Sequence, residues 1–242
     1  MTAPGENQDA LPSALRHPGS HARLWIIAGS SLAFDLWSKH WVFEQLDPDE
    51  FRTIIAKTLC FQRTLNAGAV FGSFAGFSGL FIVATLFALA FVMFIFAGCR
   101  PRQRSVHIAL GLILGGALGN LYDRAYIKAD VLTINQTSGA QYKRIGTVIE
   151  TGAEGVTIGS WPDGANAQLI SKGDIAKHTR QGVVRDFIKF VPRFPSWVPG
   201  LGGRDVWPWV FNVADSALVV GVGVLLVNFW FERRHVAVES AS

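Results

Sequence analysis

The stretch that decides the fold runs from Trp207 to Phe231 and reads WPWVFNVADSALVVGVGVLLVNFWF. A helix crosses the hydrocarbon core of a bilayer with about 20 predominantly apolar residues, and this stretch is long enough. Trp and Phe near both of its ends match the aromatic belts of membrane interfaces. Asp215 nevertheless stands inside it. Because a carboxylate in lipid is costly, the position of Asp215 needs a physical reason.

The composition of the whole chain also indicates a membrane protein. Half of its 242 residues are hydrophobic, 17% are charged, and the formal net charge is +4. No run of Lys and Arg is dense enough to indicate nucleic-acid binding, whereas a positive balance suits a protein that faces anionic lipid. Cys60 and Cys99 are expected at opposite membrane faces, so neither a disulfide nor a metal site is predicted from them.

Four stretches are long and apolar enough to be predicted as membrane spans. The second carries no charge, and the third is rich in Gly and Ala, which lets helices approach one another closely in lipid. The apolar run of the first is too long for the core of a cleavable signal peptide, so an uncleaved anchor is expected. The four stretches are Leu24–Phe43, Gly79–Cys99, Ser105–Tyr122 and Trp207–Phe231.

The distribution of basic residues predicts the orientation of these spans. Arginines precede the first span, fill the short turn between the second and third, and follow the fourth, so the positive-inside bias places both termini in the cytoplasm. Residues 1–23 are predicted to be a disordered cytoplasmic tail and residues 233–242 a second cytoplasmic tail. The outer segment 125–181 alternates polar and β-branched residues between turn residues and is predicted to form β-hairpins.

Polar side chains on three of the predicted spans are expected to meet near the outer face. At about 1.5 Å of rise per residue, Asp35 and Asp215 both lie about 12 Å below the outer ends of their spans. Asp123 and Arg124 end the third span near the rim. Ionisable residues inside a membrane are candidates for a functional site. Asp35 also has a structural interpretation, because Lys39 lies on the same helix face and can pair with it.

Asp215 is expected either to keep its proton at neutral pH or to share one with a second carboxylic acid. This residue has no basic neighbour within one helical turn, although Asn212 is near. Two adjacent acids can share a proton, which reduces the cost of burying them. Asp186, in GVVRDFIKF, is a candidate, but a solvated loop carboxylate is the simpler interpretation of that residue alone. Asn66 and Gly68, in LNAGAVFGSF, indicate by themselves only a turn before an apolar run.

Five short blocks, taken in order, resemble the lipoprotein signal peptidase family, the type II signal peptidases of bacteria. The third and fifth blocks are the most specific, and the resemblance covers residues 24–124 and 182–232 as a membrane peptidase core. The blocks are DLWSK with Asp35 and Lys39, NAGAVFG with Asn66, Gly68 and Phe71, GNLYDR with Gly119, Asn120, Asp123 and Arg124, VVRDF with Asp186, and FNVADS with Phe211, Asn212, Ala214, Asp215 and Ser216.

This resemblance implies an all-α membrane protein, a four-transmembrane-helix bundle with a small extracytoplasmic β-rich element. It implies an aspartic endopeptidase that removes signal peptides from diacylglyceryl-modified prolipoproteins, cutting just before the lipidated cysteine. Asp186 and Asp215 are implied as the catalytic pair, with no cofactor and no metal. The residues implied to bind substrate or support the site are Asn66, Gly68, Asn120, Asp123, Arg124, Asn212, Asp35 and Lys39.

The implied surroundings follow from the same resemblance. The partners are a lipidated prolipoprotein and membrane lipids, without nucleic acid. The location is the bacterial cytoplasmic (inner) membrane, crossed several times, with the active site towards the extracytoplasmic face.

Two features depart from the family pattern, and two other classes of protein remain open. Residues 125–181 form an insertion without a counterpart in the pattern, and Arg185 stands where an apolar residue is usual. Arg185 is expected either to act on Asp186 or to point to lipid phosphates. The alternatives are a small proton- or ion-coupled membrane carrier, disfavoured by the absence of an inverted repeat, and an assembly protein whose insertion binds a partner.

Overall fold

The structure is a computed structural model that describes residues 13–48, 50–68, 78–136 and 139–239. The described residues form four α-helices and nine β-strands. The helices are α1 (Pro18–Gln45), α2 (Ser78–Gly98), α3 (Arg104–Tyr126) and α4 (Val213–Glu239). The strands are β1 (Phe51–Ile55), β2 (Leu59–Asn66), β3 (Lys128–Asn135), β4 (Gln141–Thr151), β5 (Gly155–Gly159), β6 (Gln168–Ser171), β7 (Ile175–Gly182), β8 (Val184–Phe190) and β9 (Val210–Phe211).

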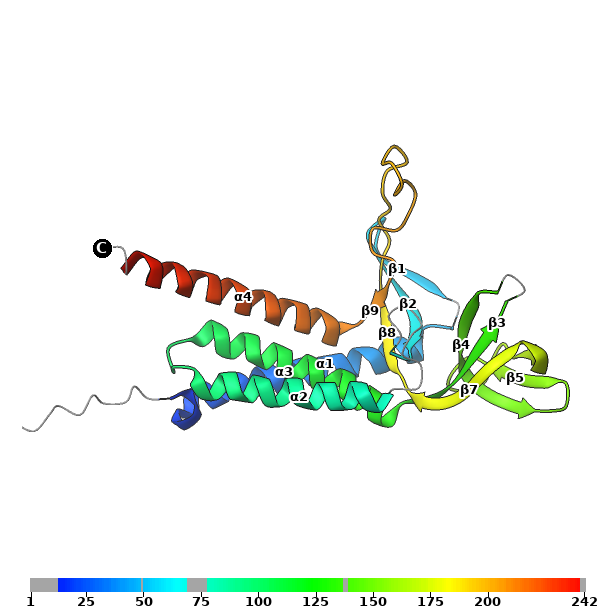
Figure 1. Cartoon of the computed structure of the whole chain (residues 1–242), viewed down its shortest axis with the longest axis horizontal. Helices are drawn as coiled ribbons and strands as arrows, with labels where there is room; N and C mark the ends of the chain where they lie inside the picture. Colours follow the sequence, from blue (N-terminus) through cyan, green and yellow to red (C-terminus); the bar gives the residue numbers. More distant parts are fainter. Residues whose placement is uncertain (1–12, 49, 69–77, 137–138, 240–242) are drawn as a thin grey trace, which may run out of the picture.

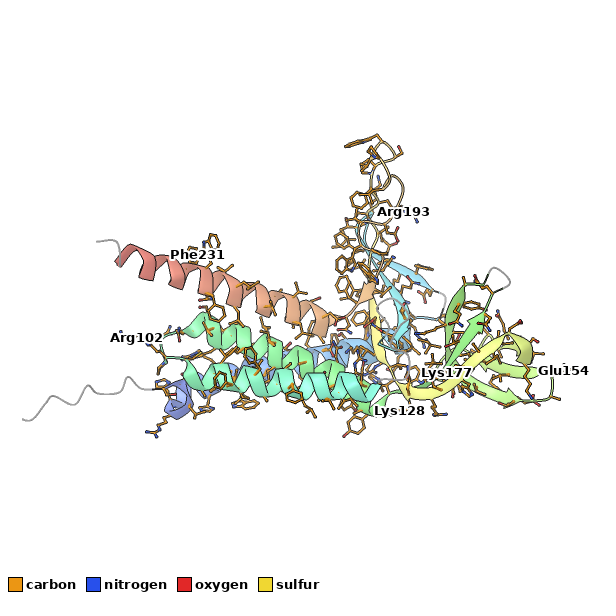
Figure 2. All side chains as sticks on the ribbon, viewed as in Figure 1. Arg102, Lys128, Glu154, Lys177, Arg193 and Phe231 are labelled. Carbon is orange, nitrogen blue, oxygen red and sulfur yellow. The ribbon has the colours of Figure 1, made fainter. Side chains whose placement is uncertain are left out.

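The helices lie side by side at one end of the molecule, and both sheets lie at the other end (Figure 1). Helix α3 is central, since it contacts α1, α2 and α4. The start of α1 and the end of α4 are both at the end of the helices away from the sheets (Figure 1). Arg102, in the turn between α2 and α3, lies at that same end (Figure 2).

Small residues let α3 approach its neighbours, as its Gly- and Ala-rich sequence predicts. A Cβ atom added at Gly115 would lie 2.6 Å from the carbonyl oxygen of Ala28 on α1. On the α4 side, a Cβ added at Gly116 would lie 2.5 Å from the carbonyl oxygen of Ala214. Both distances are shorter than any real Cβ contact, so the helix backbones pack at these positions without an intervening side chain.

The first sheet joins segments from three distant parts of the chain. Its strand order is β1-β2-β8-β9, and all its pairs are antiparallel. Thr64 of β2 is opposite Asp186 of β8, and Ile188 of β8 is opposite Phe211 of β9. Because β9 leads directly into α4, this sheet brings the end of β8 to the beginning of that helix.

The second sheet contains the predicted insertion. Its order is β6-β5-β4-β3-β7, again antiparallel throughout. The prediction of β-hairpins within 125–181 agrees with this sheet, which extends one residue beyond that range to Gly182. Residues 191–209, between β8 and β9, form a loop whose tip projects away from both sheets (Figure 1), and Arg193 lies on it (Figure 2).

The prediction of an all-α, four-transmembrane-helix bundle is wrong. Two antiparallel sheets account for a large part of the fold. Among the described residues, two helical segments are long and apolar enough to cross a membrane: α3, and the part of α4 from Val213 to Phe231. Helix α1 is less apolar, and its buried side chains include Asp35 and Lys39. In α2, the described apolar stretch, Thr85–Gly98, is shorter than a membrane span.

Two boundaries also differ from those predicted. Helix α1 begins at Pro18, within the segment 1–23 that was expected to be a disordered tail. Helix α4 begins at Val213, not at Trp207. Pro208 lacks a backbone N–H and favours an extended chain before it, and Val210–Phe211 pair with β8, so the aromatic start of the predicted span is not helical.

Candidate active site

Asp215 lies in the first turn of α4, where it forms a reciprocal cap with Asn212. The backbone N–H of Asp215 donates to Asn212 Oδ1 at 2.9 Å, and the backbone N–H of Asn212 donates to Asp215 Oδ2 at 3.2 Å. This arrangement satisfies two backbone donors at the helix start, as a capping box does. The predicted depth of about 12 Å in a span is therefore wrong, because the carboxylate is within about 3 Å of the first helical residue along the axis.

Asp186 projects from β8 towards the same point and is 2% exposed. Asn66 Nδ2 donates to its Oδ2 at 3.1 Å, and Asn212 Nδ2 donates to its Oδ1 at 2.7 Å. Burial, followed by the negative charge of Asp215, raises the pKa of Asp186 from 3.8 to about 7. Near neutral pH this carboxyl group therefore exists in both its protonated and its ionised form.

Two asparagines connect the two acids. Asn212 contacts both carboxyl groups, and Asn120 Nδ2 donates to Asp215 Oδ1 at 2.8 Å. Asn212 Nδ2 also lies 3.2 Å from Asn120 Oδ1, so the amides join each other as well. Amide groups can donate and accept at once, which lets them hold two acids in whichever protonation states the pair adopts.

A cleft gives access to this pair. Asp186 and Asp215 both border a cavity of about 660 Å³. Its walls include the end of β2, the Trp207–Phe211 segment before α4 and two residues of the insertion sheet, Lys143 and Ile145. A second hollow of about 490 Å³ adjoins Asp215 and has a nearly apolar lining, which includes Phe190, Trp207, Phe211, Val219 and Val220.

A buried ionic cluster stands behind the acid pair. Lys39 Nζ lies 2.7 Å from Asp35 Oδ2 and 3.2 Å from Asp123 Oδ2, and all three side chains are fully buried. Lys39 also donates to Asn120 Oδ1 at 3.1 Å. Asp35 Oδ1 accepts from the backbone N–H of Ala214 at 2.8 Å, which satisfies another donor at the start of α4. The cluster thus fixes both the helix and the asparagine that contact Asp215.

Arg185 belongs to this cluster and not to the acid beside it in sequence. Its guanidinium donates to Asp123 Oδ1 from Nη2 at 2.7 Å and from Nε at 3.2 Å, and its backbone N–H donates to Asp123 Oδ2 at 2.9 Å. Successive side chains of a strand point to opposite faces, so Arg185 and Asp186 diverge. Neither predicted role for Arg185, on Asp186 or on lipid phosphate, matches these contacts.

The remaining predicted residues lie around the same point. Gly68 has a φ of +81°, and its N–H donates to Asn66 Oδ1 at 2.9 Å, so the Asn-x-Gly turn is present and orients Asn66. Arg124 is half-buried at the end of α3, next to Asp123. Phe71 lies outside the described residues. The sequence did not point to Arg185 as a partner of Asp123, or to Lys143 and Ile145 as part of the cleft wall.

Two acids joined through shared asparagines at a cleft beside apolar helices are an arrangement suited to an aspartic peptidase, in which two carboxyl groups share one proton. The Signal peptidase (SPase) II family matches the chain over residues 27–231. The lipoprotein signal peptidase of Desulfitobacterium hafniense (strain DSM 10664 / DCB-2) is 26% identical over 211 residues, covering 87% of this chain and 95% of the relative. That of Clostridium novyi (strain NT) is 35% identical over 97 residues, covering 40% of this chain and 66% of the relative.

A solved structure of a bacterial membrane enzyme shares the fold. Its TM-score is 0.54 at 18% identity, and the match covers 88% of this chain and 90% of that one. Because the family match extends over most of the residues, the chain belongs to the signal peptidase II family.

Proposed function

We propose that Asp186 and Asp215 are the two catalytic acids of this chain. The chain is an aspartic endopeptidase of the bacterial membrane that removes signal peptides from prolipoproteins. The observation that carries the assignment of the residues is the contact of one residue, Asn212, with both carboxyl groups at a cleft: its side-chain amide donates to Asp186 and its backbone N–H donates to Asp215.

For such a pair to hydrolyse a peptide bond, one of the two acids must be ionised and the other must carry a proton. The ionised acid accepts a proton from water as the oxygen attacks the carbonyl carbon, and the protonated acid donates a hydrogen bond to the carbonyl oxygen. When the intermediate collapses, the C–N bond breaks and the leaving nitrogen receives a proton from the pair. The raised pKa of Asp186 suits it to hold the shared proton near neutral pH.

The asparagines and the ionic cluster are assigned positioning roles. Asn66 and Asn212 orient Asp186, while Asn120 and Asn212 orient Asp215. Gly68 permits the turn that presents Asn66. We assign Asp35, Lys39 and Asp123 to support of the helix ends, and Arg124 to substrate contact at the rim of the site.

The proposed orientation places the acid pair near the extracytoplasmic surface. The basic turn that contains Arg102 lies at the opposite end of the helices, with the start of α1 and the end of α4 (Figures 1 and 2). The positive-inside bias then assigns that end, and both termini, to the cytoplasm of a chain that crosses the membrane more than once. The apolar hollow beside Asp215 suits the acyl chains of the diacylglyceryl group.

Cleavage of a lipidated prolipoprotein by purified protein tests this proposal. Wild type, Asp186→Asn and Asp215→Asn are compared by the release of signal peptide on a gel, with Asp174→Asn as a control because Asp174 is exposed on a short turn of the insertion. We expect cleavage by wild type and by the control and none by the two other variants. Cleavage by folded Asp186→Asn at the wild-type rate would exclude Asp186 from the catalytic pair.

A further inference from the structure

The insertion is packed directly against the strand that supports the acid pair. Ala129, Val131 and Val183 form a buried cluster with Ala67, which follows β2. The backbone of Ala67 accepts a hydrogen bond from Gln181 Nε2 at 3.3 Å. The insertion sheet is thus held in a fixed position beside Asn66, the residue that contacts Asp186.

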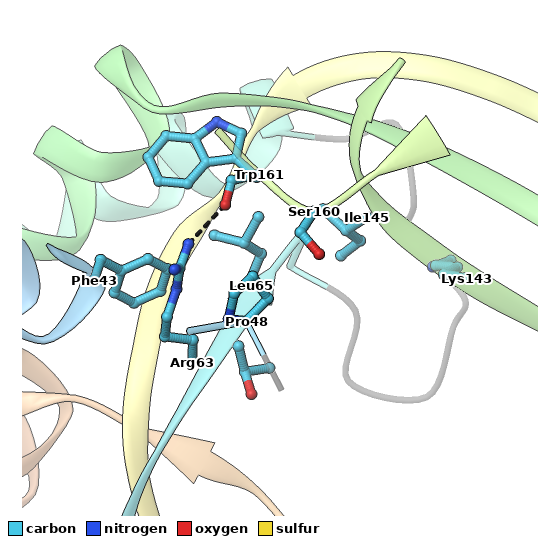
Figure 3. Close-up of a pocket in the computed structure, with 9 residues that line it drawn as sticks. Phe43, Pro48, Arg63, Leu65, Lys143, Ile145, Ser160 and Trp161 are labelled. Carbon is cyan, nitrogen blue, oxygen red and sulfur yellow. Dashed lines mark hydrogen bonds between the residues drawn. The ribbon is translucent and has the colours of Figure 1, made fainter. Parts of the chain in front are cut away.

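A second set of contacts joins β2 and the end of α1 to Trp161 of the insertion. Arg63 of β2 donates from Nη2 to the carbonyl oxygen of Trp161 at 2.6 Å and from Nη1 to that of Leu46 at 2.8 Å. The Trp161 indole N–H donates to the carbonyl oxygen of Lys128 at 3.0 Å. Arg63 also lies over the ring of Phe43, at the end of α1. Figure 3 shows Phe43, Arg63 and Trp161 at a pocket, which has a volume of about 290 Å³.

This pocket and the active-site cleft share a border. Thr64 and Leu65 of β2, with Lys143 and Ile145 of β4, line both cavities. The shared residues make one groove that runs from the acid pair, across the end of β2, to Arg63 and Trp161. The substrate polypeptide extends on both sides of the bond that is cleaved. Part of it can therefore lie in a groove that is continuous with the catalytic cleft.

The position of the groove indicates which side of the substrate it meets. The helices lie at one end of the molecule and the insertion sheet at the other, and β8 and the start of α4, which carry the two acids, lie between them (Figure 1). The signal peptide and the acyl chains are apolar and stay with the helices in the bilayer. The residues that follow the lipidated cysteine therefore leave in the direction of the insertion.

The charge of the groove favours one type of side chain. Thr133 of β3 is opposite Lys143 on one side and Lys177 on the other, so the two lysines project from the same face of the sheet. Lys143 is half-buried at the border of the two cavities, whereas Lys177 is exposed and lines neither of them. Two ammonium groups on one face create a positive potential that attracts carboxylates.

We propose that the insertion forms a binding subsite for the mature segment of the prolipoprotein, in which Lys143 favours an acidic side chain shortly after the lipidated cysteine. This inference rests on the proposed function. It assigns the insertion to substrate selection and not to the chemical step.

Matched substrates test the subsite through the specificity ratio. Lipidated prolipoproteins that carry Asp or Lys at successive positions after the cysteine are cleaved by wild type, Lys143→Glu and the control Lys177→Glu. At one of these positions we expect wild type to prefer Asp by about fivefold in kcat/KM, the effect of one partly buried ion pair. Lys143→Glu is expected to reverse the preference, and Lys177→Glu to retain it.

The possible failures are distinguishable. If wild type cleaves both substrates but Lys143→Glu has the wild-type ratio at every position, the subsite is overturned and the proposed function stands. If wild type cleaves neither, both proposals fail. A substrate with a photoactivatable residue at the preferred position, bound to Asp215→Asn, supplies a second readout in case Lys143→Glu does not fold. We expect adducts on Lys143, Ile145 or Trp161, and adducts confined to the helices would also overturn the subsite.

Discussion

Asp186 is expected to make the folded protein less stable as the pH rises, and its replacement by Asn removes this effect. Its pKa is 3.8 when unperturbed and about 7 in the folded chain. Over the interval between these values the folded chain holds a proton that the unfolded chain releases. The resulting stability is present below the lower pKa and is lost as the pH rises through the upper one.

The magnitude follows from the two pKa values. A difference of about 3 pH units corresponds to a cost of about 4 kcal/mol once the group is ionised in the folded protein, and between about pH 5 and about pH 8 wild type should lose about 2–3 kcal/mol. An Asn side chain at position 186 stays neutral at all pH values. It has one acceptor oxygen in place of two, so it keeps only one of the hydrogen bonds from Asn66 and Asn212, and the lost bond costs about 1–2 kcal/mol. Asp186→Asn should therefore be about 2–3 kcal/mol more stable than wild type at the higher pH and about equal at the lower.

Thermal unfolding in detergent measures this difference. Cys60 and Cys99 are buried, so a thiol-reactive dye reports their exposure on unfolding. For a chain of this size we expect the variant to gain about 5–10 °C in Tm at about pH 8. Asp174→Asn, at an exposed position, should unfold like wild type at both pH values. A folded Asp186→Asn that is less stable than wild type at the higher pH would refute the reasoning.

Two further substitutions test how the site is held. Asn212→Ala removes the cap of α4 and the hydrogen bond to Asp186, so we expect a loss of about 1–2 kcal/mol in unfolding free energy and a large loss of cleavage activity. Asn212→Ser can still cap the helix, so it should recover most of the stability but little of the activity. Equal activity of the two variants would contradict the bridging role. Gly116→Ala places a Cβ against the carbonyl oxygen of Ala214 and should lower the unfolding free energy by about 1–3 kcal/mol, as measured by thermal unfolding. The control Gly29→Ala adds its Cβ in open space and should be neutral or slightly stabilising. Similar melting temperatures for both glycine variants would show that α3 and α4 are not closely packed there.

The helices and the approximate meeting point of the acids could be predicted from sequence. Asp35, Asp123 and Asp215 each follow from their positions on apolar helices, and the Asp35–Lys39 pair follows from its spacing. The Asn-x-Gly turn at Asn66 is also a local feature. The Asp35–Lys39 pair and the Asn66 turn could be predicted because each depends on residues within about one helical turn of each other.

The rest depends on pairing between distant segments. Asp186 reaches Asp215 because β8 pairs with β2 on one side and with β9 on the other, and hydrophobic periodicity does not specify such partners. The same pairing makes Val210 and Phe211 extended, so an apolar run that looked like the start of a span is a strand. The partner of Arg185 could not be predicted either, since Asp123 is 62 residues away in sequence.

The central claim is that the carboxyl groups of Asp186 and Asp215 act as one unit, and a double-mutant cycle tests it most directly. Single-turnover cleavage of a lipidated prolipoprotein is measured for wild type, Asp186→Asn, Asp215→Asn and the double variant. We predict that the double variant is no slower than the slower single variant, because loss of either acid already disables the pair. A double variant whose loss equals the product of the two single losses would show two independent residues and contradict the account.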